Sequence, residues 1–195
     1  MSILLPGNPG KALDVLDAYD TAHIQFIPDG RANGIYDVKA IIRQRYIHFE
    51  NPQEALKTLR PTEFELLVAA LFDRMGYSVK LTRMSHDGGV DIIAERITSG
   101  SRALVFIQCK RSSHNVSVGT IRELTGVVLK EHANKGIVVA CGDFTAQARN
   151  AADATPTIEL IGFQELNVLL NQHLGADWPR SMSFYIRLME GSRAS

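Results

Sequence analysis

Asp91, Gln108 and Lys110 are the residues whose types and spacing point most directly to chemistry in this chain. The aspartate opens one short apolar stretch, residues 90–94, and the Gln-x-Lys closes the next, residues 103–110. A carboxylate and an amide oxygen are hard ligands of the kind that Mg²⁺ prefers, and a nearby ammonium group stabilises negative charge. Brought together, these groups would hold a divalent cation against a phosphodiester.

A β-hairpin is the local structure that would bring them together. Both stretches are rich in β-branched and apolar residues, and residues 98–101 between them have turn-forming composition. If the turn is centred after Ser99, Asp91 lies directly opposite Gln108, and Lys110 shares their face while Cys109 points to the other. The alternative is that these polar residues are merely the solvated ends of two apolar strands.

Glu65 is the fourth candidate, from a different element. Apolar residues over 64–75 recur with helical spacing, which predicts an amphipathic helix that ends at Gly76. Glu65 lies at the border of the apolar stripe, close enough to approach a sheet beneath it. Its competing interpretation is a capping box with Thr62, in which its carboxylate would bond the Thr62 amide.

The remaining pattern predicts an α/β fold. Strands are predicted over 77–81, 136–141 and 157–161, and helices over 118–133, 145–152 and 163–174. Helices that alternate with strands imply crossover connections, hence a mixed β-sheet flanked by helices on both faces. We expect one main domain at 59–174, an N-terminal appendage at 1–58 of unknown role with one helix near 13–23, and a C-terminal tail at 175–195.

Composition narrows the function classes. Lys plus Arg and Asp plus Glu both number 21, so DNA binding would need a local basic patch rather than a global field. Lys and Arg do cluster near the hairpin, although a solvated rim explains them equally well: Lys80, Arg83, Arg96, Arg102, Lys110 and Arg111. The two cysteines lie in apolar stretches and no long apolar run occurs, which predicts buried thiols, a cytoplasmic location and no membrane partner.

Five motifs occur in order along the chain: Phe64-Glu65, Gly76-Tyr77, Asp87-Gly88-Gly89-Val90-Asp91, Gln108-Cys109-Lys110-Arg111, and Gly142-Asp143-Phe144-Thr145 with Ala148. Over about residues 60–173 this series resembles the catalytic domain of Mrr-type restriction endonucleases, a branch of the PD-(D/E)XK nuclease superfamily. Val90 stands where the superfamily name has proline. Gln108 replaces an acidic residue, which leaves one fewer negative charge for a cation.

The resemblance implies a restriction-endonuclease-like core and assigns four catalytic residues: Glu65, Asp91, Gln108 and Lys110. Mg²⁺, with Mn²⁺ as a substitute, would be held by Asp91, by Gln108, by the backbone carbonyl of Cys109 and, through water, by Glu65. Candidate DNA contacts are Arg83, Gly88, Gly89, Arg111, Ser112, Ser113 and Thr145. Capping of the following helix is the competing role for Thr145, and turn formation competes for the two glycines.

The expected function is Mg²⁺-dependent endonucleolytic cleavage of DNA in restriction or anti-phage defence. Cutting both strands would need a homodimer or larger assembly, and a partner protein would have to supply any ATPase or recognition function. Two alternatives stay open at this point. One is a catalytically silent DNA-binding or assembly subunit with a nuclease fold, and the other is a repair or recombination nuclease that acts on branched DNA.

Overall fold

The computed structural model describes residues 52–82, 89–112, 114–175 and 177–193, together with five helical residues earlier in the chain. Those five are Val15, Leu16, Ala18, Tyr19 and Val38. By its internal contacts the chain divides into residues 1–52 and 53–195, and the second unit contains all four candidate catalytic residues. Most of the helix predicted over 13–23, with Arg83, Asp87, Gly88 and Ser113, lies outside the described residues.

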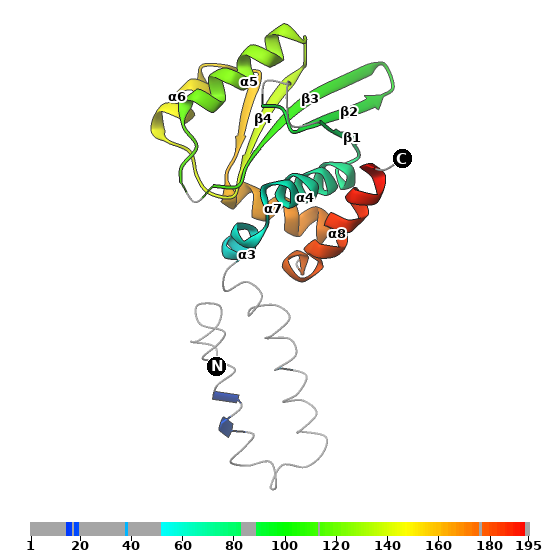
Figure 1. The fold of residues 1–195 in the computed structure, drawn as a ribbon, viewed down its shortest axis with the longest axis vertical. Helices are drawn as coiled ribbons and strands as arrows, with labels where there is room; N and C mark the ends of the chain where they lie inside the picture. Colours follow the sequence, from blue (N-terminus) through cyan, green and yellow to red (C-terminus); the bar gives the residue numbers. More distant parts are fainter. Residues whose placement is uncertain are drawn as a thin grey trace. The chain divides into compact units, whose positions relative to one another are not determined.

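A five-stranded mixed sheet forms the centre of the second unit, with its strands in sequence order (Figure 1). The strands are β1 (Ser78–Leu81), β2 (Ile92–Thr98), β3 (Ser101–Lys110), β4 (Lys135–Ala140) and β5 (Ile158–Ile161). β1, β2 and β3 are antiparallel neighbours, whereas β3, β4 and β5 run parallel. Parallel neighbours need crossover connections, and helices supply both of them.

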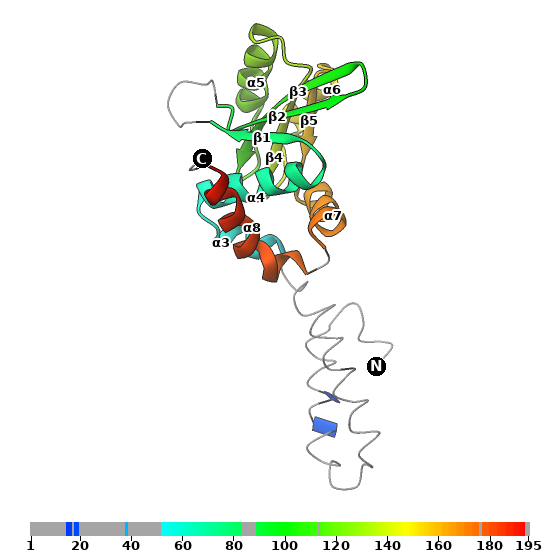
Figure 2. The same ribbon diagram turned by 90° about the vertical axis from the view of Figure 1, so that its right-hand side faces the viewer.

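Helices cover both faces of the sheet, as Figures 1 and 2 show. The crossover helices α5 (Val118–Lys130) and α6 (Ala146–Asp153) pack on one face. The other face carries α4 (Pro61–Arg74), α7 (Phe163–Leu174) and α8 (Trp178–Arg193), while α3 (Pro52–Thr58) leads into α4. The predicted α/β class and the two-sided arrangement are therefore confirmed.

The helix α4 shows how the apolar pattern sets the layers. Phe64, Leu67, Leu71 and Phe72 are all almost fully buried against the sheet, as the helical spacing predicts. The helix ends at the expected place because Gly76 adopts a φ of 87°. That left-handed residue lets the amide of Tyr77 donate to the carbonyl of Phe72 at 3.1 Å, which closes the last turn.

Residues 177–193 of the C-terminal tail pack on this core. α8 packs against α4, and its Trp178 is fully buried with Ile186 and Met189 in the same apolar cluster. The indole nitrogen of Trp178 donates to the side chain of Asn167 on α7 at 3.2 Å. None of the helices in the described part of the chain has the length and apolar content that a membrane crossing requires.

Candidate active site

The predicted hairpin register holds along the whole β2–β3 ladder. It runs from the pair Ile92 and Ile107 to the pair Thr98 and Ser101, with the turn after Ser99. One further step would set Asp91 opposite Gln108, but the ladder stops before it. The amide of Asp91 donates to the carbonyl of Ile107 at 2.9 Å, so Asp91 lies just beyond the last pair.

The Asp91 side chain is tied to the end of β3. One carboxylate oxygen, Oδ2, accepts the amide hydrogen of Cys109 at 2.6 Å. On the other side, the amide of Thr82 donates to the Asp91 carbonyl at 3.0 Å, and the Thr82 hydroxyl donates to the carbonyl of Val90 at 2.6 Å. These hydrogen bonds hold Asp91 in place between the end of β1 and the end of β3.

Strand alternation separates Cys109 from Gln108, as predicted. Cys109 packs with Ile107 and Val105 in the apolar cluster under α4, whereas Phe106 belongs to the cluster under α5 and α6. Gln108 thus faces the α5 side. Its side chain is only 2% exposed, and its Oε1 atom is buried without a hydrogen-bond partner among the described residues.

Three charged groups influence the pKa of the Cys109 thiol. Burial raises the pKa of Cys109 well above its ordinary value, the negative charges of Asp91 and Glu65 raise it further, and the positive charge of Lys110 opposes them. Glu65 reaches this position from α4, while Lys110 is the last residue of β3. Glu65, Asp91 and Lys110 are therefore within electrostatic range of one atom, whereas Gln108 is the residue before Cys109 and faces the other side of the sheet.

The two charges at the strand ends act on each other. Burial raises the pKa of Asp91, while the hydrogen bond from Cys109 and the charge of Lys110 lower it. Desolvation is the largest of the three effects, so the carboxylate holds a proton more tightly than an exposed aspartate would. A cation or another positive group at this position would favour the ionised form.

Glu65 does not cap its helix. α4 begins at Pro61, which makes Thr62 the second helical residue and Arg60 the N-cap. The amide of Arg60 donates to the carboxylate of Glu63 at 2.7 Å, so Glu63 performs the role that the capping-box interpretation gave to Glu65. That interpretation is wrong, and Glu65 is half-buried beside the sheet.

The candidate residues could bind a hard cation such as Mg²⁺ only if the side-chain amide oxygen of Gln108 is one of the ligands. Across the described ranges, no three His, Cys, Asp or Glu side chains come together as a metal-binding group. Asp91, Glu65 and the buried Oε1 of Gln108 are instead mixed oxygen donors, which Mg²⁺ accepts together with water and substrate oxygens.

Comparison with known proteins identifies the domain that this site belongs to. The family model of the Mrr catalytic domain, described as a restriction endonuclease, matches residues 56–170. The chain belongs to the Mrr restriction endonuclease family.

Individual relatives agree with this assignment. The type IV methyl-directed restriction enzyme EcoKMrr of Escherichia coli is 24% identical over 128 residues, which cover 63% of this chain and 42% of that protein. An uncharacterized Sinorhizobium fredii protein, y4cE, is 31% identical over 97 residues, 49% of this chain and 25% of its own length. The chain thus spans less than half the length of either relative.

A solved structure shares the fold. The DNA modification-dependent restriction endonuclease AspBHI superposes with a TM-score of 0.59 at 20% identity, over 75% of this chain and 40% of that one. At this identity the likeness concerns the fold alone.

The described members of the predicted DNA-contact set of the Mrr domain make contacts within the protein. Thr145 is the N-cap of α6, and its hydroxyl accepts the amide hydrogen of Ala148 at 3.2 Å, so the capping interpretation is confirmed. Arg111 donates from Nη1 to the carbonyl of Lys57 at 3.0 Å, which ties the end of β3 to α3. The hydroxyl of Ser112 accepts the amide hydrogen of His114 at 3.0 Å.

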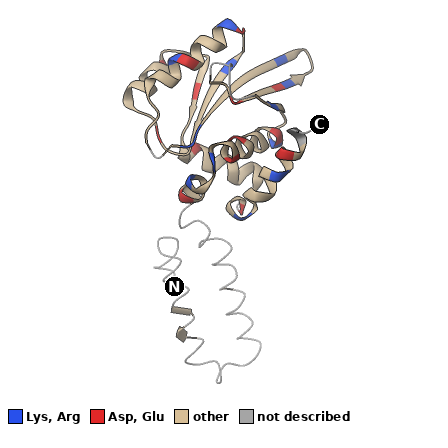
Figure 3. Cartoon of the chain, viewed as in Figure 1, with Lys and Arg blue, Asp and Glu red and all other residues tan. Residues whose placement is uncertain are grey.

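Two of the described basic residues near the hairpin make contacts within the protein. Arg102 forms an ion pair with Glu95 across the two strands, and the guanidinium of Arg96 lies 4.6 Å from the ring centre of Tyr77. Figure 3 shows both signs of charge interspersed over this part of the Mrr domain. Arg96 and Arg102 are thus engaged within the protein.

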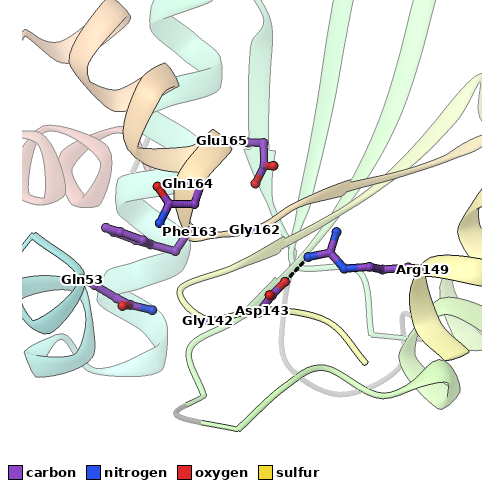
Figure 4. A pocket seen from close by; sticks show the side chains of 8 residues that line it. All are labelled: Gln53, Gly142, Asp143, Arg149, Gly162, Phe163, Gln164 and Glu165. Atoms are coloured by element: carbon purple, nitrogen blue, oxygen red, sulfur yellow. Dashed lines mark hydrogen bonds and ion pairs between the residues drawn. The ribbon is translucent and has the colours of Figure 1, made fainter. Parts of the chain in front are cut away.

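Sequence reasoning missed a cavity at the ends of β4 and β5 (Figure 4). Its volume is about 180 Å³. Gly142 and Gly162 follow the two strands and leave room at its floor, and an ion pair between Asp143 and Arg149 forms one wall. Two glycines that come within two residues of the ends of buried strands were the available signal.

Proposed function

We propose that this chain is a Mg²⁺-dependent endodeoxyribonuclease that hydrolyses DNA phosphodiester bonds where β2 begins and β3 ends. One observation carries the proposal: Oε1 of Gln108, the residue before Cys109 whose amide binds Asp91, is buried without a hydrogen-bond partner in the described part of the chain. Such an atom costs about 1 to 3 kcal/mol when it stays unpaired. A bound cation would remove that cost, and membership in the Mrr family supports the choice of reaction.

The cation would be held by oxygen atoms from three strand-end residues. The carboxylate of Asp91 and the Oε1 of Gln108 would bind it directly, the backbone carbonyl of Cys109 would complete the protein ligands, and Glu65 would act through a water molecule. Mn²⁺ should substitute because it accepts the same donors. When bound, the ion supplies Lewis acidity that lowers the pKa of a water molecule and neutralises charge on the phosphate.

Lys110 would act on charge rather than as a base. Its ammonium group favours the ionised form of Asp91, as the lowering of the Asp91 pKa by Lys110 indicates. The same positive charge would orient the attacking water and stabilise the negative charge that develops on the phosphate oxygens during cleavage. Loss of Lys110 would leave the Asp91 carboxylate without a stabilising positive charge, and loss of Asp91 would leave Lys110 without a neighbouring negative charge.

The biological setting follows by analogy with the relatives. The Escherichia coli relative is named a methyl-directed restriction enzyme, so we propose restriction or anti-phage defence in the cytoplasm, with methylated DNA as one substrate to test. Cleavage of both strands requires two active sites, which favours a homodimer or larger assembly. Because both curated relatives are more than twice as long as their matched regions, further recognition or ATPase functions would reside in other segments or partner proteins.

Plasmid cleavage tests the proposal. Purified protein should nick or linearise supercoiled plasmid in Mg²⁺ or Mn²⁺ and not in EDTA, with unmethylated, methylated and branched DNA compared in parallel. Asp91→Ala should abolish cleavage while the protein keeps its circular dichroism spectrum and its elution volume. DNA binding without any cleavage would identify a silent assembly subunit, and cleavage confined to branched DNA would identify a repair nuclease.

A further inference from the structure

Gly89 occupies a position that only glycine fits, for two separate reasons. Its φ is 84°, in the left-handed region that side chains disfavour. In addition, a Cβ atom at this position would lie 2.3 Å from Nε2 and 3.3 Å from Cδ of Gln108. The second reason concerns one particular neighbour, the proposed amide ligand of the cation.

The contact decides how the Gln108 amide lies. The terminal torsion of a glutamine side chain is broad and roughly two-fold, so packing and hydrogen bonds must choose its orientation. Here Nε2 lies 2.3 Å from the Cβ position of residue 89, while Oε1 lies 3.8 Å from it and has no hydrogen-bond partner among the described residues. Because Gln108 is 2% exposed, the side chain has little other space to enter.

We propose that Gly89 is a positioning residue that directs the Gln108 carbonyl oxygen towards the cation. This inference rests on the proposed nuclease function. It assigns to Gly89 a role through the Gln108 side chain, in place of the turn-forming or phosphate-approach roles that its sequence context suggested. Any side chain at position 89 would displace the Gln108 amide. A substitution there should therefore weaken cation binding more than it destabilises the fold.

Gly100 provides a matched control. It lies in the turn at the other end of the same hairpin, and its φ of 86° is nearly the same as that of Gly89. No described atom beyond its own chain neighbours lies within 4 Å of its Cβ position. Gly100→Ala therefore introduces the same backbone strain without crowding a neighbour, and any excess effect of Gly89→Ala comes from the Gln108 contact.

The test follows the Gln108 side-chain NH₂ signal by NMR in ¹⁵N-labelled protein, assigned through its absence in Gln108→Ala. Paramagnetic Mn²⁺ bound next to this amide broadens the signal, which reports cation binding without any cleavage. Gly89→Ala should shift the signal and raise the Mn²⁺ concentration needed to broaden it by about tenfold to a hundredfold, the range typical of residues that orient metal ligands. Gly100→Ala should do neither.

Parallel assays separate the competing roles. Gly89→Ala should raise the Mg²⁺ concentration for half-maximal cleavage while its DNA affinity in EDTA, measured by fluorescence anisotropy, stays within about twofold of wild type. The inference is overturned if Gly89→Ala matches Gly100→Ala in the NMR titration, or if it weakens DNA binding in EDTA and leaves the Mn²⁺ requirement unchanged. Failure of wild-type protein to cleave would instead overturn the nuclease proposal, and the NMR titration would still decide the role of Gly89.

Discussion

At one end of the β2–β3 hairpin the chain turns through Ser99 and Gly100, and the other end carries Asp91 and Gln108. The turn end is exposed: Ile97 is 75% accessible, and the charge of Arg102 is balanced by Glu95 in an ion pair on the surface. Neither of these charges is buried away from water. The charged groups at the turn end are therefore paired and solvated at little cost in free energy.

The opposite end of the same ladder is assembled differently. Burial raises the pKa of Asp91 and of the Cys109 thiol, and the Gln108 carbonyl oxygen has no partner in the described ranges. These are unfavourable arrangements for a protein without a ligand. The turn end thus balances its charges at the surface, whereas the end with Asp91 and Gln108, the proposed functional end, keeps polar groups buried, as a site for the proposed cation would require.

The largest expected effect contrasts the cations at the two ends. Lys110→Ala should lower the rate of plasmid cleavage by about a hundredfold to a thousandfold, because it removes the charge that stabilises the phosphate during reaction. Arg102→Ala, which removes an exposed cation from the turn end, should leave the rate within about twofold of wild type. Equal losses in the two variants would mean that the hairpin binds DNA as a general basic surface.

Packing gives the second contrast. Ile107 is fully buried at the functional end, and shortening it to Val should lower the free energy of unfolding by about 0.5 to 1.5 kcal/mol. The same Ile→Val change at the exposed Ile97 should alter it by less than about 0.5 kcal/mol. Urea denaturation in EDTA measures both. Comparable losses would contradict the difference in burial between the two ends.

Much of this hairpin is predictable from sequence because few variables determine it. Two apolar stretches with period-two alternation and a single turn at Ser99 leave one register, which in turn decides the faces of Gln108 and Cys109. The relation of Gly89 to Gln108 could not be derived in the same way. It depends on how a loop packs over a strand end, and no local pattern encodes that contact.

The helix ends show where local rules compete. A Thr-x-x-Glu pattern suggested a cap at Thr62, but Pro61 favours the first helical position, which makes Arg60 the N-cap and Glu63 its partner. The residues after 175 gave a weak signal because Pro and Gly interrupt the apolar pattern. Burial of Trp178 against α4 and α7 overrides that local weakness, and the segment forms the helix α8.

A smaller and more diagnostic effect concerns the stability of the functional end itself. Because the pKa of Asp91 is raised in the folded protein, the folded state binds that proton more tightly than the unfolded state does. The stabilising contribution is therefore complete below the unfolded value of about 3.9, and it is lost as the pH rises through the higher folded value. Above that window the buried carboxylate is a net cost when no cation is bound.

Asp91→Asn should consequently be more stable than wild type at neutral pH in EDTA, by about 0.5 kcal/mol, although it should not cleave DNA. The difference should shrink as the pH is lowered, because the wild-type carboxyl group then becomes neutral as well. Saturating Mg²⁺ should remove or reverse it, because a ligand that binds only the folded wild type stabilises that protein alone. Urea denaturation at three pH values, with and without Mg²⁺, measures each of these effects. If Asp91→Asn were less stable than wild type in EDTA at every pH, the hydrogen bond from Cys109 would outweigh desolvation, and the functional end would be as well satisfied as the turn end.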